Sequence, residues 1–242
     1  MKLIRDESGE VVNETIFNHI VGSLRYLCNS IPEMSFGVGL ISRFMSSPKR
    51  SLMLAMKRVL RYIQGTSDYG VLFPDGEQHS ELELIGFVDS GYGRDLVERK
   101  STSGYICLLN KASISWCSKK QFVDALSSCE AKYIFGSFAT CQAMWLVELL
   151  RELKVSMKAP LELRIDNIFA INMSKNPISH GRSRHIEIRF NFLRDLVNKE
   201  RVALVYWKTD LQLVDAMTKV LKNDRFEGLR KLIGVISLKH LT

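Results

Sequence analysis

The chain has 242 residues, a formal net charge of +8 at pH 7 and 46% hydrophobic residues. That is enough apolar material for one large domain or two small ones, and no apolar run approaches the roughly 18 to 20 residues of a membrane span. The charged start, MKLIRDESGE, lacks the apolar core of a signal peptide. The five cysteines show no CxxC spacing. We therefore expect an intracellular protein, cytoplasmic or nuclear, with reduced cysteines, no membrane contact and no zinc site.

The excess of positive charge is spread over several stretches of the chain. Basic residues recur in SPKRSLMLAMKRVLRYIQG, ERKSTSG, SHGRSRHIEIRFNFLR and KVLKNDRFEGLRK. These stretches are either ordinary solvated helix faces or a surface that binds nucleic-acid phosphates. Charge alone does not separate the two interpretations.

The first 75 residues are predicted to be helical. In the stretch between Ser47-Pro48 and Gly65, apolar residues repeat at three- and four-residue steps: Leu52, Met56, Val59, Leu60 and Ile63. The polar segment PDGEQHSE (74–81) then predicts a boundary. We expect a small helical segment over 1–75 and a separate domain over 80–235.

The pattern beyond the boundary predicts an α/β domain. Strands are expected at 82–90, 103–110 and 112–119, the last two joined by a short turn at Asn110-Lys111. A long helix over 125–153 follows, and then a strand, two helices, a strand and two helices, at 161–166, 168–176, 184–200, 202–208, 211–221 and 224–234. Three consecutive strands followed by alternating helices and strands favour a mixed sheet flanked by helices.

Isolated acids fall near the ends of these elements. Asp89 ends the first strand, Asp166 closes the strand at 161–166, Glu130 lies in the first turns of the long helix, and Asp215 lies early in a later helix. If the first and fourth strands are adjacent, Asp89 and Asp166 stand side by side, and the two helices could add the other acids. Each strand-end acid could equally be a turn former.

Carboxylates this close together would repel one another unless a cation intervened. Oxygen ligands without His or Cys suit Mg²⁺ or Mn²⁺, and two such ions can activate a water and stabilise a leaving oxygen at a phosphate. Glu130 has no evident side-chain partner, since Lys132 is two positions on and helical neighbours lie three or four apart. We therefore expect Lys132 to point elsewhere and a metal to match Glu130.

Several motifs carry a resemblance to a known family. The stretch KSTSGYICLLNKASISWCSKKQFVDALSSCEAKY, with IDN, NPISHGRSRHIEIRFNFLRD and TDLQLVDAMTK, resembles the ribonuclease H domain of copia-type retrotransposon Pol polyproteins. The stretches IVGSLRYLCNSIPEMSFGVGLISRFMSSP and AMKRVLRYIQGTSDYGVLF resemble the end of the adjoining reverse transcriptase. The resemblance covers nearly the whole chain in the family's order.

The resemblance implies a ribonuclease H-like fold that cuts the RNA strand of an RNA–DNA hybrid with two Mg²⁺ or Mn²⁺ ions. It implies that Asp89, Glu130, Asp166 and Asp215 hold the metals. It also implies a partner in the remainder of the reverse transcriptase, and neither a membrane nor a small-molecule cofactor. Polymerase activity is not expected, because the polymerase's paired-aspartate turn is absent from this chain.

Some residues depart from the family's usual pattern. Lys132 stands where the family usually has glutamate, and Ser90-Gly91-Tyr92 follows Asp89 where Ala-Asp-Trp is usual. These departures leave an alternative open, in which the chain is a catalytically silent remnant that at most binds nucleic acid through its basic surface.

Six further residues are candidates for contact with nucleic acid: Ser101, Thr102, Asn167, Arg182, Arg184 and His185. Arginine forks match phosphate geometry, and Asn167 could read a 2′-hydroxyl. The alternatives are turn capping for the hydroxyls, a solvated helix face for the arginines and a helix-start position for His185. Trp116 and Trp145 are predicted to be core residues.

Overall fold

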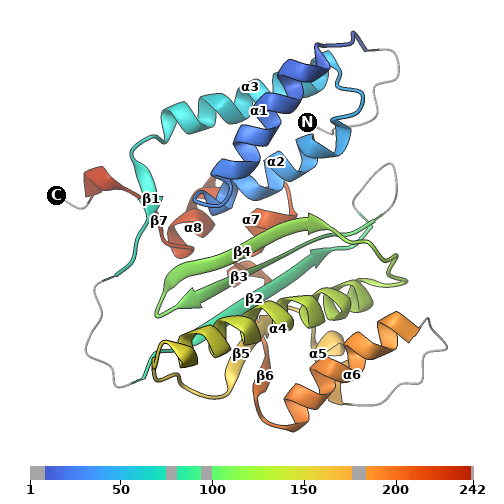
Figure 1. The fold of residues 1–242 in the computed structure, drawn as a ribbon, viewed down its shortest axis with the longest axis vertical. Coiled ribbons are helices and arrows are strands. Elements are labelled where there is room, and N and C mark those ends of the chain that lie inside the picture. The colour runs from blue at the N-terminus through green and yellow to red at the C-terminus, as the bar shows by residue number, and fades with distance from the viewer. Residues whose placement is uncertain (1–8, 75–80, 94–99, 176–183, 241–242) are drawn as a thin grey trace.

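The computed structural model describes residues 9–74, 81–93, 100–175 and 184–240 (Figure 1). Its α-helices are α1 (Glu14–Leu27), α2 (Ser35–Ile41), α3 (Arg50–Gly65), α4 (Ser128–Glu152), α5 (Ile168–Lys175), α6 (Arg184–Asn198), α7 (Asp215–Thr218) and α8 (Asn223–Leu232). Its strands are β1 (Tyr69–Val71), β2 (Leu84–Gly91), β3 (Thr102–Leu109), β4 (Ala112–Lys120), β5 (Leu161–Ile165), β6 (Val202–Tyr206) and β7 (Val235–Ser237).

Five of the strands form one mixed sheet in the order β4-β3-β2-β5-β6. The pairs β2–β3 and β3–β4 are antiparallel, whereas β2–β5 and β5–β6 are parallel. The helices α4, α5 and α6 lie on one side of this sheet, and α7 and α8 lie on the other (Figure 1). The prediction of a ribonuclease H-like mixed sheet flanked by helices is confirmed.

The hairpin between β3 and β4 has the turn that the sequence predicts. Asn110 and Lys111 have φ angles of 45° and 72°, and two positive φ angles in a two-residue loop match the twist of the flanking strands. Asn110 also accepts a hydrogen bond on Oδ1 from the Glu83 backbone N–H at 2.8 Å. The turn is therefore held by its own backbone preference and by the neighbouring strand.

Helix α4 is the central helix of the domain. By length and composition alone, it is long and apolar enough to cross a membrane. The expectation that no apolar run approaches a membrane span is therefore wrong. However, 56% of its apolar window is buried inside the protein, where Tyr133, Phe135 and Ala139 join the core beneath the sheet. Trp145 on this helix is 61% exposed, so its prediction as a core residue is wrong.

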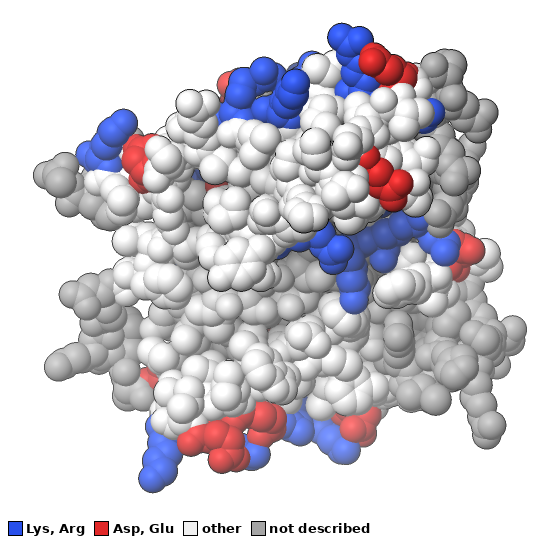
Figure 2. All heavy atoms as spheres, turned by 45° about the horizontal axis from the view of Figure 1, so that its top comes forward, with Lys and Arg blue, Asp and Glu red and all other residues white. Residues whose placement is uncertain are grey.

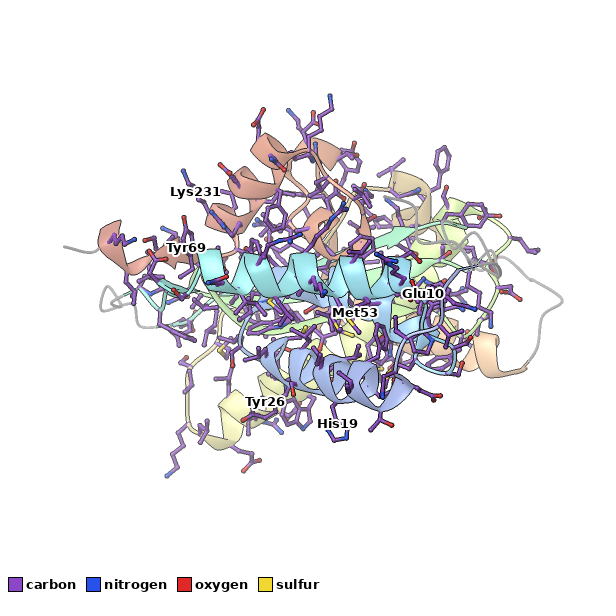
Figure 3. The ribbon with its side chains drawn as sticks, turned by 90° about the horizontal axis from the view of Figure 1, so that it is seen from above. Glu10, His19, Tyr26, Met53, Tyr69 and Lys231 are labelled. Atoms are coloured by element: carbon purple, nitrogen blue, oxygen red, sulfur yellow. The ribbon has the colours of Figure 1, made fainter. Side chains whose placement is uncertain are left out.

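The N-terminal helices have a core of their own. Phe17, Val21, Leu24 and Met56 are all at most 1% exposed and pack together with other apolar residues of α1, α2 and α3. Viewed from above, α1 and α3 lie side by side, with His19 and Tyr26 projecting from α1 (Figure 3). These helices therefore bury their apolar residues against one another.

The N-terminal segment contacts the sheet domain at several places. The half-buried Trp116 of β4 donates its indole N–H to the Cys28 backbone oxygen at 2.7 Å. Strand β1 pairs antiparallel with β7, near the end of the chain, and the sequence predicted neither strand. The predicted boundary falls largely on 75–80, outside the described residues, and the division into 1–75 and 80–235 stays a prediction.

The segment around Asp215 is less helical than predicted. The helix expected over 211–221 is limited to α7, and a single 3₁₀ turn (Thr209–Leu211) precedes it. Asp215 is the first residue of α7, and α7 packs on β3 and α2. This short helix places Asp215 beside the sheet.

Candidate active site at the acid-bearing end of the sheet

Strands β2 and β5 bring two of the predicted acids together. The two strands are parallel neighbours, and their last aligned pair is Val88 with Ile165. Asp89 is the next residue of β2 and Asp166 is the residue that follows β5, so they lie side by side at one end of the sheet. Their side chains are 0% and 3% exposed, and buried carboxylates require partners.

Lys132 of α4 is the partner that both aspartates share. Its Nζ lies 3.0 Å from Asp89 Oδ1 and forms an ion pair with Asp166 Oδ1. The Lys132 side chain is only 11% exposed. Lys132 therefore points away from Glu130, as predicted, and its ammonium group lies between the two carboxylates, a position that the sequence did not predict.

Asp215 joins the same cluster through a second lysine. Lys219 Nζ lies 3.2 Å from Asp89 Oδ2 and 2.5 Å from Asp215 Oδ1. Arg225 of α8 pairs with the other Asp215 oxygen at 2.7 Å, and Thr218 Oγ1 donates to Asp89 Oδ2 at 2.6 Å. Three of the four predicted acids therefore belong to one buried network of charges.

The charges of this network balance one another. Three carboxylates (Asp89, Asp166 and Asp215) pair with three cations (Lys132, Lys219 and Arg225). Burial by itself would raise the pKa of Asp89, but the ammonium groups of Lys132 and Lys219 lower it to about 2. Burial tends to lower the pKa of Lys132, and the two aspartates outweigh that effect and raise it. Asp89 and Lys132 are thus held in their charged forms. Burial raises the pKa of Asp215, and the neighbouring Lys219 and Arg225 do not fully offset that effect.

Glu130 is used differently. Its backbone N–H donates to Ser127 Oγ at 3.1 Å, and its Oε2 accepts from the Leu126 N–H at 2.7 Å. Ser127 is the N-cap of α4, so the pair resembles a capping box. It differs in that the Glu130 carboxylate accepts from the N–H of Leu126, the residue before the cap. The buried Glu130 carboxylate therefore helps to cap the N-terminus of α4.

The residues present do not fit the predicted pair of metal ions. Among the described residues, which include all four predicted acids, no group of three or more His, Cys, Asp or Glu side chains could hold a metal. The position between Asp89 and Asp166 is taken by the Lys132 ammonium group. The predicted four-acid metal site is therefore corrected to an acid centre with three acids and three cations.

The candidate nucleic-acid contacts at the start of β3 are also corrected. Ser101 and Thr102 are both 3% exposed. Ser101 Oγ accepts from the Gly93 N–H at 3.3 Å, and Thr102 Oγ1 accepts from Arg43 at 2.9 Å. Both hydroxyls bond within the protein, so neither is placed to touch a phosphate.

The other candidates lie at or near helix starts. Asn167 Oδ1 accepts from the Ala170 N–H at 2.9 Å and so caps α5; contact with a 2′-hydroxyl stays a prediction. Arg182 lies outside the described residues. Arg184 and His185 begin α6, and the structure does not describe their side chains.

Basic residues that the sequence analysis did not single out lie at the same end of the sheet. In the register of β3 and β4, Ser103 pairs with Lys119 and Thr102 pairs with Lys120, one and two rows beyond the row of Asp89. Arg43 reaches this end through its bond to Thr102. Figure 2 shows Lys and Arg atoms gathered in a hollow on one face of the molecule. The paired lysines at the end of β4, in SKKQ, were the available sequence signal.

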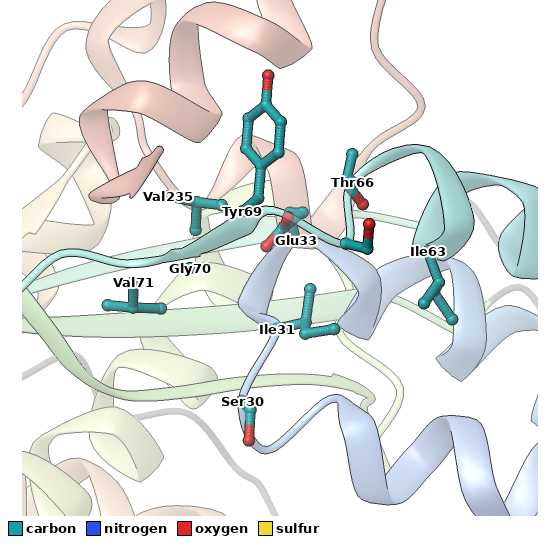
Figure 4. Close-up of a pocket in the computed structure, with 10 residues that line it drawn as sticks. Ser30, Ile31, Glu33, Ile63, Thr66, Tyr69, Gly70, Val71 and Val235 are labelled. Carbon is teal, nitrogen blue, oxygen red and sulfur yellow. The ribbon is translucent and has the colours of Figure 1, made fainter. Parts of the chain in front are cut away.

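Another buried acid, Glu33, lies away from this centre. It lines a cavity of about 190 Å³ together with Thr66, Tyr69 and other residues of the N-terminal segment and β7 (Figure 4). Tyr62 donates to Glu33 Oε1 at 2.9 Å, and among the described residues Glu33 Oε2 has no hydrogen-bond partner. Burial raises the pKa of Glu33.

Comparison with known proteins identifies the family. No family model matches the chain. It is 34% identical over 237 residues, 98% of its length, to the retrovirus-related Pol polyprotein from transposon RE2 of Arabidopsis thaliana, and 33% identical over 223 residues, 91% of its length, to that from transposon TNT 1-94 of Nicotiana tabacum. The chain belongs to the Pol polyprotein family of copia-type retrotransposons. It spans 16% of the length of each of these two Pol polyproteins.

Solved structures agree on the fold alone. The chain resembles a foamy viral protease–reverse transcriptase in complex with double-stranded DNA, with a TM-score of 0.52 and 11% identity over 81% of this chain and 32% of that one. LC11-RNase H1 in complex with an RNA/DNA hybrid aligns with 56% of this chain and 94% of that one, at a TM-score of 0.40 and 12% identity. We assign this Pol segment a ribonuclease H-like fold from the strand order of its sheet, β4-β3-β2-β5-β6.

Proposed function

We propose that this Pol segment is a ribonuclease H-type module that binds an RNA–DNA hybrid at the acid-bearing end of its sheet but does not hydrolyse it by the two-metal reaction. The observation that carries the proposal is the Lys132 ammonium group between Asp89 and Asp166. Family membership and fold support the ribonuclease H-type class and its substrate. The composition of the centre argues against the reaction in this chain.

Binding is supported by the charges around the centre. Arg43, Lys119 and Lys120 lie at the end of β3 and β4, next to the row that holds Asp89, and the whole chain carries a net charge of +8. Pairing of Lys and Arg with phosphates supplies most sequence-independent affinity for nucleic acid. A hybrid backbone laid across this end would meet these cations.

Hydrolysis needs a group that activates water at the scissile phosphate. In this centre, each carboxylate that could hold an ion for that purpose is paired with a Lys or Arg. A divalent ion would have to displace buried ion pairs, and breaking such a pair costs about 3–5 kcal/mol. The residues of this chain therefore bind and position a hybrid more readily than they cut it.

A second candidate function is two-metal hydrolysis of the RNA strand, as the family resemblance implies. It is favoured by one observation, the gathering of Asp89, Asp166 and Asp215 into one network. It would require Lys132 and Lys219 to leave the centre when ions and substrate enter. The two candidates predict opposite results in a cleavage assay.

The test combines binding and cleavage on one labelled RNA–DNA hybrid. Fluorescence anisotropy measures the binding. We expect it to weaken as salt is raised and to weaken further in Lys119→Gln and Lys120→Gln. Lys199→Gln, in the turn that follows α6, is the matched control. With Mg²⁺, we expect no cleavage above that of Asp166→Asn. Cleavage that Asp166→Asn abolishes would establish the second candidate, and no binding at low salt would overturn the proposal.

A further inference from the structure

Lys132 occupies the place of a cation between two buried carboxylates. Its Nζ contacts both Asp89 and Asp166, and all three side chains are at most 11% exposed. We infer that the Lys132 ammonium group substitutes for a divalent cation in this chain, and that one substitution, Lys132→Glu, converts the acid centre into a divalent-metal site. The inference deepens the proposed function and rests on it, because it concerns the same centre of paired carboxylates and cations.

The geometry of α4 supports the conversion. The side chain at position 132 leaves the helix toward the gap between Asp89 and Asp166, as the two ion pairs show. A glutamate at this position would direct its carboxylate into the same gap on a shorter stem. A Mg²⁺ ion, with metal–oxygen distances of about 2.0–2.1 Å, would fill the space that the ammonium group leaves.

The balance of charge supports it as well. The centre now holds three carboxylates and three cations, so an added Mg²⁺ or Mn²⁺ would leave two positive charges unmatched. Lys132→Glu removes one cation and adds one carboxylate. Four carboxylates would then face Lys219 and Arg225, and the excess of two negative charges equals the charge of one divalent ion.

Glu130 does not supply this missing ligand, although it lies only two residues away. Its Oε2 accepts from the Leu126 N–H, and its own N–H binds the Ser127 cap. Residues two apart on a helix are rotated by about 200° about its axis, so they face nearly opposite sides. The residue that decides metal binding is therefore position 132, and Glu130 is a helix-capping residue.

Metal affinity of the purified full chain tests the inference without nucleic acid. We expect Mn²⁺, titrated by calorimetry, to bind Lys132→Glu at least tenfold more tightly than it binds the wild-type chain or Lys132→Gln, which loses the ammonium group and gains no charge. The double variant Lys132→Glu/Glu130→Gln should keep the gain. Lys132→Glu/Asp89→Asn should lose it.

Three results would overturn the inference. These are equal Mn²⁺ affinity in the wild type and Lys132→Glu, equal affinity in Lys132→Glu and Lys132→Gln, and loss of the gain in the double variant with Glu130→Gln. If Lys132→Glu does not fold alone, circular dichroism gives the answer: refolding on addition of Mn²⁺ supports the inference, and no refolding contradicts it. Failure to bind a hybrid would overturn the proposed function and leave this result standing.

Discussion

The N-terminal helices and the acid-bearing end of the sheet each bury a carboxylate, and they stabilise it in opposite ways. Glu33 is 5% exposed and Asp89 is 0% exposed, so both lose their contact with water. Burial raises the pKa of Glu33, whose nearest hydrogen-bond partner is the neutral hydroxyl of Tyr62. Two ammonium groups lower the pKa of Asp89 despite the same burial. The neighbours of a buried acid, rather than its depth, decide its charge.

This difference separates a structural acid from a candidate functional one. Glu33 borders a cavity and has one hydrogen-bonded oxygen and one without a partner among the described residues. Asp89 belongs to a network in which each charge depends on its neighbours. Removing one member should therefore cost far more at the sheet end than among the N-terminal helices.

The largest effect is expected for Lys132→Met, which keeps the length of the side chain and removes its charge. Asp89 and Asp166 would then face each other in a buried site, and breaking a buried pair costs about 3–5 kcal/mol. Urea unfolding at pH 7 measures the loss. Lys199→Met is the matched control, because its pair with Asp195 is exposed and such pairs contribute about 0–1 kcal/mol. Equal effects of the two substitutions would contradict a network held by Lys132.

A smaller effect, dependent on pH, is expected for Glu33→Gln. Because the pKa of Glu33 is raised in the folded chain, its contribution to stability is complete below the ordinary glutamate pKa and is lost as pH rises through the folded value. One such group changes the free energy of unfolding by at most about 1.4 kcal/mol per pH unit.

Glutamine keeps an acceptor for Tyr62 and carries no charge. Urea unfolding of Glu33→Gln between pH 4 and pH 8 should therefore lack the decline that the wild type shows over this range. The exposed residue Glu10 provides the control, and Glu10→Gln should keep the wild-type profile. Parallel profiles for the wild type and Glu33→Gln would show that burial does not raise the pKa of Glu33.

The smallest effect is expected at the N-terminus of α4. Ser127→Ala removes the acceptor for the Glu130 N–H, and loss of an N-cap costs about 1 kcal/mol. Thermal unfolding of the full chain measures it. Ser128→Ala, one position inside the helix, is the control and should change stability less. A larger loss from Ser128→Ala would contradict the capping role of Ser127.

Local patterns in the sequence were sufficient to predict much of the fold. The strands, the long helix and the turn at Asn110-Lys111 follow from hydrophobic periodicity and turn chemistry, which act between residues close in the chain. The adjacency of Asp89 and Asp166 also followed once the first and fourth strands were taken as neighbours. The β1–β7 pair was missed because each strand has only three residues. Three residues are too few to show the alternation of apolar and polar side chains that predicts a strand.

The sequence by itself determined that acids would gather at one end of a mixed sheet, because strand ends and strand order are set by patterns along the chain. It did not determine which side chain of α4 would meet them. Glu130 and Lys132 both lie near the start of that helix, and only its rotation against the sheet decides between them. That rotation depends on core packing between residues far apart in sequence, and it turned Lys132 toward Asp89 and left Glu130 to cap the helix.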